Sequence, residues 1–235
     1  MSGPGGTQVI GLLGGMGWES SLHYYKLLNL GVEQRLGGLH SARTVMSSVD
    51  FAQVSALQEA EQWDDVAEIL VAAARGVEAA GADFLLMCTT AFHRVADQVA
   101  DAVDIDLLHL GDVLADRIRA QGLTTVALLG TSFTMGRRFF ADRLASHGLG
   151  VVVPAEEHHA EINRIIYDEL VHGRVENASR KRVVGLVDRL WDEGAQGVVL
   201  GCAELEMLVK QPDAELPLFG STALHVEAAL DRALA

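Results

Sequence analysis

Short apolar runs alternate along the chain with longer amphipathic stretches. Eight short runs have the length and composition of buried strands. They are Val9–Leu13, Arg43–Ser48, Phe84–Met87, Leu107–Leu110, Val126–Leu129, Gly150–Val153, Val198–Leu200 and Leu216–Phe219. Eight longer segments have the apolar spacing of helices, and several are followed by glycine, as helix C-termini favour. They are Ser20–Arg35, Trp63–Ala80, Ala91–Val103, Gly111–Gln121, Met135–Ser146, Glu156–His172, Glu176–Glu193 and Thr222–Leu234.

This alternation predicts an α/β fold with parallel sheets covered by helices on both faces. We expect two doubly wound α/β domains, with the active site in the cleft between them, outside the carboxyl ends of the strands. The predicted first domain is discontinuous, comprising residues 8–112 and 221–235, because the last helix has no strand after it and is expected to fold back. The predicted second domain spans residues 113–220, and residues 1–7 are expected to form a disordered tail.

The two halves of the chain contain similar phrases. Residues 81–88 and 194–202 each begin with Gly-Ala, continue through an apolar run and end in a cysteine; the glycines lie 113 residues apart and the cysteines 114. A second echo, between Val9–Gly14 and Val126–Gly130, is displaced by 117 residues. The repeat predicts two pseudo-symmetric domains that carry one cysteine each at equivalent positions.

Composition adds limits. The chain has 235 residues, of which 49% are apolar, with 24 glycines and 4 prolines, and this suits a packed globular protein of two halves. No apolar run reaches the ~18 to 20 residues that span a bilayer. The first residues lack a basic region followed by an apolar core, so we expect a cytoplasmic protein with free thiols rather than a disulfide.

The charge of the chain excludes some partners. Eighteen basic and 32 acidic residues give a net charge of −14, which repels nucleic acid and anionic membrane surfaces. A small anionic substrate would therefore need local donors, for which Arg43 and backbone amides are candidates.

The two cysteines, Cys88 and Cys202, are the candidate catalytic groups. A cysteine after an apolar strand is also compatible with a small buried hydrophobe. However, each stands just before a predicted helix start, where backbone amides and the helix dipole favour thiolate and lower the thiol pKa. Thr89 and Thr90 follow the first cysteine, and Glu204 follows the second. Two equivalent acid/base groups aimed at one point are what inversion of a stereocentre needs.

Metal binding is a rival use of the same atoms. Cys88, His93 and Cys202, together with His109 or Glu204, offer zinc-type donors. There is no Cys-x-x-Cys and no His-x-x-x-His spacing that would present two ligands on one face, so we expect no metal site.

Pyridoxal phosphate, the common cofactor of amino-acid racemisation, needs a Schiff-base lysine. The chain holds only Lys26, Lys181 and Lys210, and none follows a strand beside a phosphate-binding loop. We therefore expect no cofactor and direct proton transfer by thiols.

The glycine-rich stretch Gly11–Ser20 follows a predicted strand and precedes a predicted helix, where backbone amides can bind an anion. The Walker pattern is missing, and the dinucleotide pattern fits only with Ser20 in place of the third glycine. Nucleotide binding, a tight turn that needs glycine φ angles, and a carboxylate-binding loop all stay open.

Taken together, these motifs resemble the aspartate/glutamate racemase superfamily, specifically its aspartate racemase branch, from about Val9 to the C-terminus. The matching stretches are Ile10–Ser20, Leu39–Arg43, Ser48–Phe51, Cys88-Thr89, Leu128–Met135, Ile165–Leu170 and Leu200–Glu204. The resemblance implies two pseudo-symmetric α/β domains, no cofactor, Cys88 and Cys202 as the acid/base pair, and commonly a homodimer.

The resemblance also implies substrate contacts at Met16, Arg43, Thr89 and Thr131. The chain departs from the family pattern at three further substrate-binding positions. Where such racemases usually read Cys-Thr-Asn-Thr and Gly-Cys-Thr-Glu, this chain has Thr90, Ala91 and Ala203 in place of the asparagine and two threonines.

The expected function is racemisation of aspartate, glutamate or a related polar amino acid by two cysteines without a cofactor. The alternatives are a related decarboxylase or cis-trans isomerase, and a catalytically silent small-molecule binding module on the same fold.

Overall fold

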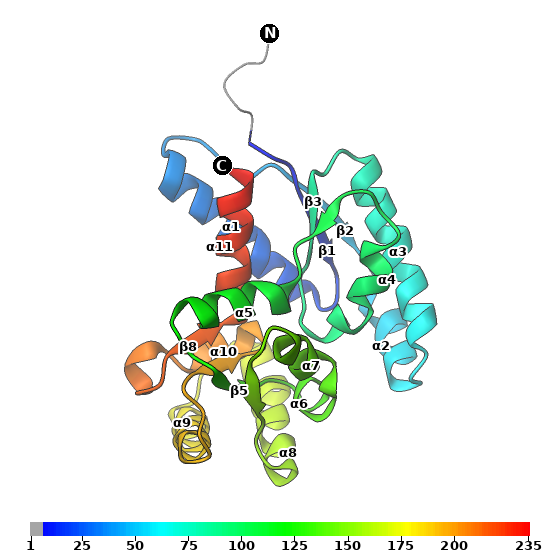
Figure 1. The fold of residues 1–235 in the computed structure, drawn as a ribbon. Helices are drawn as coiled ribbons and strands as arrows, with labels where there is room; N and C mark the ends of the chain where they lie inside the picture. The colour runs from blue at the N-terminus through cyan, green and yellow to red at the C-terminus, as the bar shows by residue number, and fades with distance from the viewer. Residues whose placement is uncertain (1–6) are drawn as a thin grey trace. The chain divides into compact units, whose positions relative to one another are not determined.

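The computed structural model describes residues 7–235, which divide into two compact units (Figure 1). Unit 1 runs to Leu110 and resumes over His225–Ala235; unit 2 is Gly111–Leu224. Each unit holds a parallel four-stranded sheet flanked by helices, which confirms the α/β fold class. The tail expected at residues 1–7 lies, apart from Thr7, outside the described residues.

The unit 1 sheet has the order β2-β1-β3-β4, with all neighbours parallel. Its strands are β1 (Ile10–Gly14), β2 (Thr44–Ser48), β3 (Phe84–Met87) and β4 (Asp106–Leu107). The register pairs Gly14 with Ser48 and Leu13 with Met87, so these strands end at the same edge of the sheet. The residues that follow them therefore lie close together.

Helices cover both faces of this sheet. They are α1 (Trp18–Leu36), α2 (Phe51–Glu59), α3 (Trp63–Ala79), a 3-10 turn η1 (Ala91–Val95), α4 (Ala96–Ala100) and α11 (Ser221–Ala233). In Figure 1, α1 and the red α11 lie on one side of β1 and β3, and α3 lies on the other. Tyr24 and Leu28 of α1 pack with Leu230 of α11 against Ile10 and Phe84, and this buried cluster includes Cys88.

The unit 2 sheet repeats the topology of the first, with the order β6-β5-β7-β8 and parallel neighbours. Its strands are β5 (Thr125–Leu129), β6 (Gly150–Val152), β7 (Val198–Leu200) and β8 (Leu218–Gly220). Strand β7 thus occupies the place of β3, and the repeat inferred from the two cysteine phrases is confirmed at the level of topology.

The remaining helices belong to unit 2, except that α5 begins one residue before it, and the first four residues of α11 also belong to unit 2. They are α5 (Leu110–Ala120), α6 (Ser132–Gly136), α7 (Arg138–Ser146), α8 (Glu156–Arg164), a π-helical segment η2 (Ile165–Glu169), a 3-10 turn η3 (Leu170–His172), α9 (Asn177–Asp192), α10 (Ala203–Leu208) and a 3-10 turn η4 (Gln211–Asp213). Ile162, Leu190 and Leu205 pack with Leu129 and Leu200 in the main core of this unit.

Several predicted elements differ from those observed. The sequence prediction missed α2, whose first turn is capped by Asp50 through a hydrogen bond from the Ala52 backbone N–H. The single helix predicted over Ala91–Val103 is wrong, because the segment is a 3-10 turn followed by the short α4. The strand predicted over Leu107–Leu110 shares only Leu107 with the observed β4, since the residues that pair with β3 are Asp106 and Leu107.

In unit 2, the helix predicted over Met135–Ser146 is two helices, separated at Arg137, whose backbone is extended. The helix predicted over Glu156–His172 keeps its α-helical form only to Arg164 and continues as η2 and η3. None of the helices in residues 7–235 is both long enough and apolar enough to span a membrane.

Candidate functional site

Cys88 directly follows β3 at the carboxyl edge of the unit 1 sheet. Its side chain is 1% exposed, and it packs with the α1 and α11 side of the core. The backbone N–H of Cys88 donates to the Leu13 carbonyl at 3.0 Å, and the Ser20 hydroxyl donates to the Cys88 carbonyl at 2.5 Å. Strand pairing on one side and α1 on the other therefore fix the backbone that carries this thiol.

The three residues after Cys88 lead into η1, which begins at Ala91. Thr89 is partly exposed, Thr90 is buried, and Ala91 is the first residue of the 3-10 turn. The Thr89 carbonyl accepts a hydrogen bond from Nδ1 of His93 at 2.8 Å. The structure thus places Thr89, Thr90 and Ala91 beside Cys88 at one edge of unit 1.

The glycine-rich loop reaches the same edge from β1. Gly15 has φ of +92°, and a Cβ there would lie 2.2 Å from the Val49 carbonyl oxygen, so only glycine fits this close approach. The Gly15 N–H donates to the Ser21 hydroxyl at 2.9 Å, and Met16 next to it is buried. The tight turn that the sequence left open is therefore real, and it brings Met16 to the carboxyl edge that holds Cys88.

Cys202 occupies the equivalent place in unit 2. It follows β7, after Gly201, and is the N-cap residue of α10, with extended φ and ψ of −154° and 151°. Ala203, the first residue of α10, is buried. A Cβ on Gly201 would lie 2.9 Å from the Leu129 carbonyl, so the chain runs close against β5 immediately before the thiol.

Thr131 stands at the end of β5, after Gly130. Its hydroxyl caps α6, accepting a hydrogen bond from the Thr134 backbone N–H at 3.3 Å and lying 3.1 Å from the Thr134 hydroxyl. Because β5 and β7 are parallel neighbours, Thr131 and Cys202 lie at the same edge of the unit 2 sheet.

The protonation of both thiols differs from the expectation. Burial raises the pKa of Cys88 well above its usual range. Burial also raises the pKa of Cys202, as does the carboxylate of Glu204, whereas the backbone N–H of Leu205 acts in the opposite direction. The prediction of low thiol pKa values is wrong for this structure, because desolvation outweighs the helix terminus at Cys202, and Cys88 precedes a 3-10 turn rather than an α-helix.

Two further residues belong to the surroundings of Cys202. Tyr167 is 49% exposed. The partial burial of its hydroxyl raises its pKa most, and the negative charges of Cys202 and Glu204 raise it further. It lies in the π-helical segment η2, a rare conformation that is frequent at functional sites. Tyr167 and Glu204 stand in sequence stretches that match the racemase pattern, but the sequence did not indicate that both lie near the sulfur of Cys202.

Glu206 lies on the short helix α10, which begins after Cys202, and it links α10 to α11. Its carboxylate accepts a hydrogen bond from the Thr222 backbone N–H at 2.7 Å, and burial, the largest influence, raises its pKa to about 7. A Cβ on Gly220 would come within 2.7 Å of this carboxylate, so the glycine provides the space for it.

Arg43 requires a correction. It precedes β2, its carbonyl accepts the Ile10 N–H at 2.8 Å, and its guanidinium donates to the Thr7 carbonyl at 2.7 Å. This is the amino edge of the unit 1 sheet, separated from the carboxyl edge by the length of β2, about 16 Å at the usual rise per residue. The structure does not bring Arg43 to Cys88, and we leave it out of the proposed site.

The structure shows how the candidate metal donors are engaged. Within residues 7–235, no group of three or more His, Cys, Asp and Glu side chains is arranged to hold a metal ion. Both ring nitrogens of His93 are engaged by backbone groups, Thr89 on one side and Leu110 on the other. Both cysteines are free thiols.

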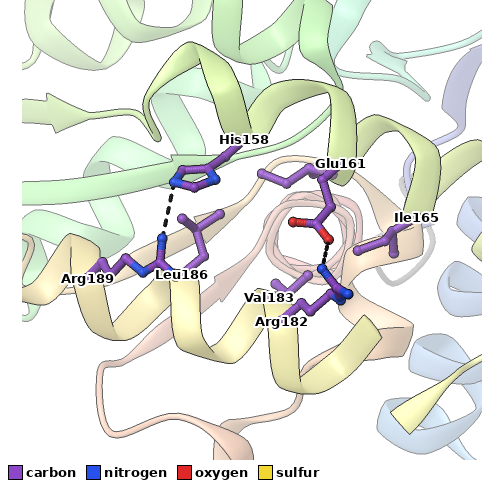
Figure 2. Close-up of a pocket in the computed structure, with 8 residues that line it drawn as sticks. His158, Glu161, Ile165, Arg182, Val183, Leu186 and Arg189 are labelled. Atoms are coloured by element: carbon purple, nitrogen blue, oxygen red, sulfur yellow. Dashed lines mark hydrogen bonds and ion pairs between the residues drawn. The ribbon is translucent and has the colours of Figure 1, made fainter. Parts of the chain in front are cut away.

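A hollow of about 120 Å³ lies between α8 and α9 in unit 2 (Figure 2). Its polar groups are engaged with one another: Arg182 pairs with Glu161, and Arg189 lies 3.2 Å from Nε2 of His158. None of the site residues predicted from the sequence lines this hollow.

Comparison with known proteins identifies the family. The Asp/Glu/hydantoin racemase family matches residues 13–229. The chain belongs to this family.

Solved structures of similar proteins agree with this. A protein from Yersinia pestis assigned as an Asp/Glu racemase shares 40% identity and superposes with a TM-score of 0.92, covering 97% of this chain and 100% of that one. An aspartate racemase homologue from Pyrococcus horikoshii OT3 shares 33% identity with a TM-score of 0.89 and the same coverage. A double mutant of arylmalonate decarboxylase has the same fold, at 15% identity and a TM-score of 0.59, covering 97% of this chain and 93% of that one.

Proposed function

We propose that this protein is a cofactor-independent racemase of aspartate, glutamate or a related polar amino acid, with Cys88 and Cys202 as its acid/base pair. The observation that carries the proposal is their equivalence: each thiol follows the third strand of a sheet with the same strand order. Membership of the Asp/Glu/hydantoin racemase family supports the reaction class.

In the proposed reaction, the thiolate of one cysteine removes the Cα proton and becomes a thiol. The thiol of the other cysteine then donates its proton to the opposite face of the carbanion and becomes the thiolate. One C–H bond breaks and one forms, so the substrate is inverted without net gain or loss of protons.

The raised thiol pKa values define a requirement of this chemistry. Both sulfurs favour the protonated form in this structure. The ammonium group of a bound amino acid is a nearby positive charge, which lowers a thiol pKa and favours the thiolate needed to start the reaction. Deprotonation is therefore proposed to accompany substrate binding.

Substrate placement is proposed to use residues at the same two sheet edges. Met16, Thr89, Thr90 and Ala91 accompany Cys88 in unit 1, and Thr131 and Ala203 accompany Cys202 in unit 2. Two of the family's polar side chains are alanine here, and its asparagine is threonine at position 90. We therefore propose a substrate whose polar end differs from, or is bound less tightly than, that of aspartate.

The direct test is a screen of the common L-amino acids in deuterated water, with chiral chromatography and mass spectrometry of the products. The expected result is a D-enantiomer carrying deuterium at Cα, formed after dialysis and in the presence of a chelator. The double variant Cys88→Ala, Cys202→Ala serves as the matched control. Activity that disappears with the chelator, or that persists in the double variant, would contradict the proposal.

A binding module on the same fold is the second candidate, favoured by the replacements at Thr90, Ala91 and Ala203. The same screen separates the two, because a binding module exchanges no Cα hydrogen although calorimetry detects binding. A decarboxylase would instead release carbon dioxide from a malonate-type substrate, which the mass of the product reveals.

We also propose that the protein acts as a homodimer. Trp18, Leu22 and Tyr25 form an exposed apolar stripe along α1, since residues at this spacing share a helix face. Burial of the stripe against a second copy would remove it from water. Leu22→Glu is expected to shift the sedimentation coefficient toward that of the monomer, whereas Glu33→Gln, on the exposed surface of the same helix, leaves it unchanged.

A further inference from the structure

We propose that His93 is a positioning residue for Cys88: its neutral ring ties the Cys88-Thr89 backbone to the first residue of α5. The expected effect of His93 on turnover rests on the proposed function. Its expected effect on the Cys88 thiol rests on the geometry alone.

Two hydrogen bonds define the ring. Nδ1 lies 2.8 Å from the Thr89 carbonyl oxygen, and Nε2 lies 3.3 Å from the backbone nitrogen of Leu110. A carbonyl only accepts and an N–H only donates, so Nδ1 carries the proton and Nε2 accepts. The ring is therefore a neutral imidazole of fixed tautomer, engaged at both ends.

His93 completes the anchoring of the catalytic backbone. The Ser20 hydroxyl already holds the Cys88 carbonyl at 2.5 Å, and His93 holds the next carbonyl, that of Thr89. Two consecutive peptide groups are thus fixed by side chains from different elements, α1 and η1. The Cα of Cys88 lies directly before the first of these peptide groups, so the bond from Ser20 restrains the Cys88 side chain directly and the bond from His93 restrains it through Thr89.

The neighbouring rings fix the orientation of His93. Its ring meets that of His109 edge to face at 4.8 Å and that of His225 at 6.0 Å. His225 is itself held by Tyr24 at 2.9 Å and by the Leu108 carbonyl at 2.8 Å. His225 is therefore bonded to Tyr24 of α1 and to Leu108, the residue after β4. His93, in contrast, is bonded to Thr89, the residue next to Cys88.

The two bonds can be separated by substitution. Asparagine at 93 places an amide N–H where Nδ1 is, and so retains the donor to Thr89 but not the acceptor for Leu110. Glutamine reaches the position of Nε2, and so retains the acceptor for Leu110 but not the donor to Thr89. Each variant is thus the matched control of the other.

We expect kcat of His93→Asn to stay within about threefold of the wild type, and kcat of His93→Gln to fall about tenfold or more with KM little changed. Hydrogen exchange of the Leu110 amide, followed by NMR, should show the reverse order: about tenfold faster in His93→Asn and near wild type in His93→Gln. Equal kcat in the two variants, or the opposite order, would overturn the proposal.

A second control tests whether the loss of any buried ring from this cluster is enough to lower kcat. His225→Gln retains an amide donor to Leu108 and removes an imidazole from the same cluster, so its kcat should remain within about twofold of the wild type. A fall as large as that of His93→Gln would overturn the positioning role, because loss of ring packing would then be sufficient.

The thiol itself gives a readout that needs no turnover. The rate of alkylation of Cys88 by iodoacetamide, relative to Cys202 and resolved by mass spectrometry, should rise in His93→Gln and stay unchanged in His93→Asn. If wild-type protein racemises no amino acid but this pattern holds, the proposed function fails and the positioning role stands. If the wild type racemises and both variants alkylate like it, only the positioning role fails.

Discussion

The carboxylate of Glu206 accepts the Thr222 backbone N–H at 2.7 Å, so a residue of α10 holds the first turn of α11. The same helix begins at Cys202. One short element thus carries a candidate catalytic thiol at its start and a half-buried carboxyl group three residues after its first residue.

This carboxyl group makes stability depend on pH. Burial raises its pKa to about 7. Between about pH 4.5 and 7 the unfolded chain releases this proton and the folded protein keeps it, so its contribution to folding stability is present at low pH and lost as pH rises. We expect the free energy of unfolding of the wild type to fall over this range by at most about 3 kcal/mol relative to Glu206→Gln.

Urea denaturation of both proteins at intervals from pH 4.5 to 8 measures the effect. Glutamine keeps the acceptor for Thr222 without titrating, so the difference isolates the ionisation. Parallel pH curves for the two proteins would refute the raised pKa.

His225 has the opposite dependence. Burial, with a smaller effect of His93, lowers its pKa to about 3. Below about pH 6.5 the His225 ring takes up a proton in the unfolded chain but not in the folded protein. The contribution of His225 to folding stability is therefore fully present above that pH and is lost as the pH falls. His225→Phe should therefore lose less stability than the wild type when pH is lowered from 7 to 5. Tyr24→Phe, which removes only the hydroxyl bonded to His225, should keep the wild-type slope in the same denaturation series.

The two-thiol mechanism predicts an asymmetry between single variants. Cys88→Ala and Cys202→Ala should each abolish racemisation, because one face of Cα loses its acid or base. Each variant should still exchange the Cα hydrogen of the one enantiomer that faces the remaining thiol. Proton NMR in deuterated water measures this exchange, and we expect the two variants to select opposite enantiomers. Exchange of the same enantiomer by both would rule out opposed bases.

Specificity should respond to the three replaced positions. Thr90→Asn with Ala91→Thr and Ala203→Thr restores the family's usual neighbours of the cysteines, and we expect kcat/KM for aspartate or glutamate to rise about tenfold relative to other substrates. Thr90 and Ala203 are buried, so the thermal midpoint must be measured alongside. A folded triple variant with the preference of the wild type would place specificity elsewhere.

Much of the molecule could be predicted from sequence, for identifiable reasons. Seven of the eight described strands overlap well with the apolar runs that predicted them, because strands buried between helices need continuous apolar residues, whereas β4 shares only Leu107 with its predicted run. The helix missed at Phe51–Glu59 has a weakly amphipathic pattern, and its start depends on one Asp50 side chain. Arg43 was misplaced although the predicted strand begins with it, because the first residue of a strand in a parallel sheet lies at the edge opposite to the carboxyl ends.

The sequence by itself determined the strand and helix alternation, the internal repeat and the pair of cysteines at equivalent positions, because all three are local patterns or comparisons between segments. The tertiary structure alone decided which groups surround each thiol. Ser20 holds the Cys88 carbonyl from 68 residues away in the chain, and His93 holds the Thr89 carbonyl from four residues away, through the turn η1. Burial raises both thiol pKa values. Desolvation depends on everything packed around an atom, so no motif in the chain could have revealed it.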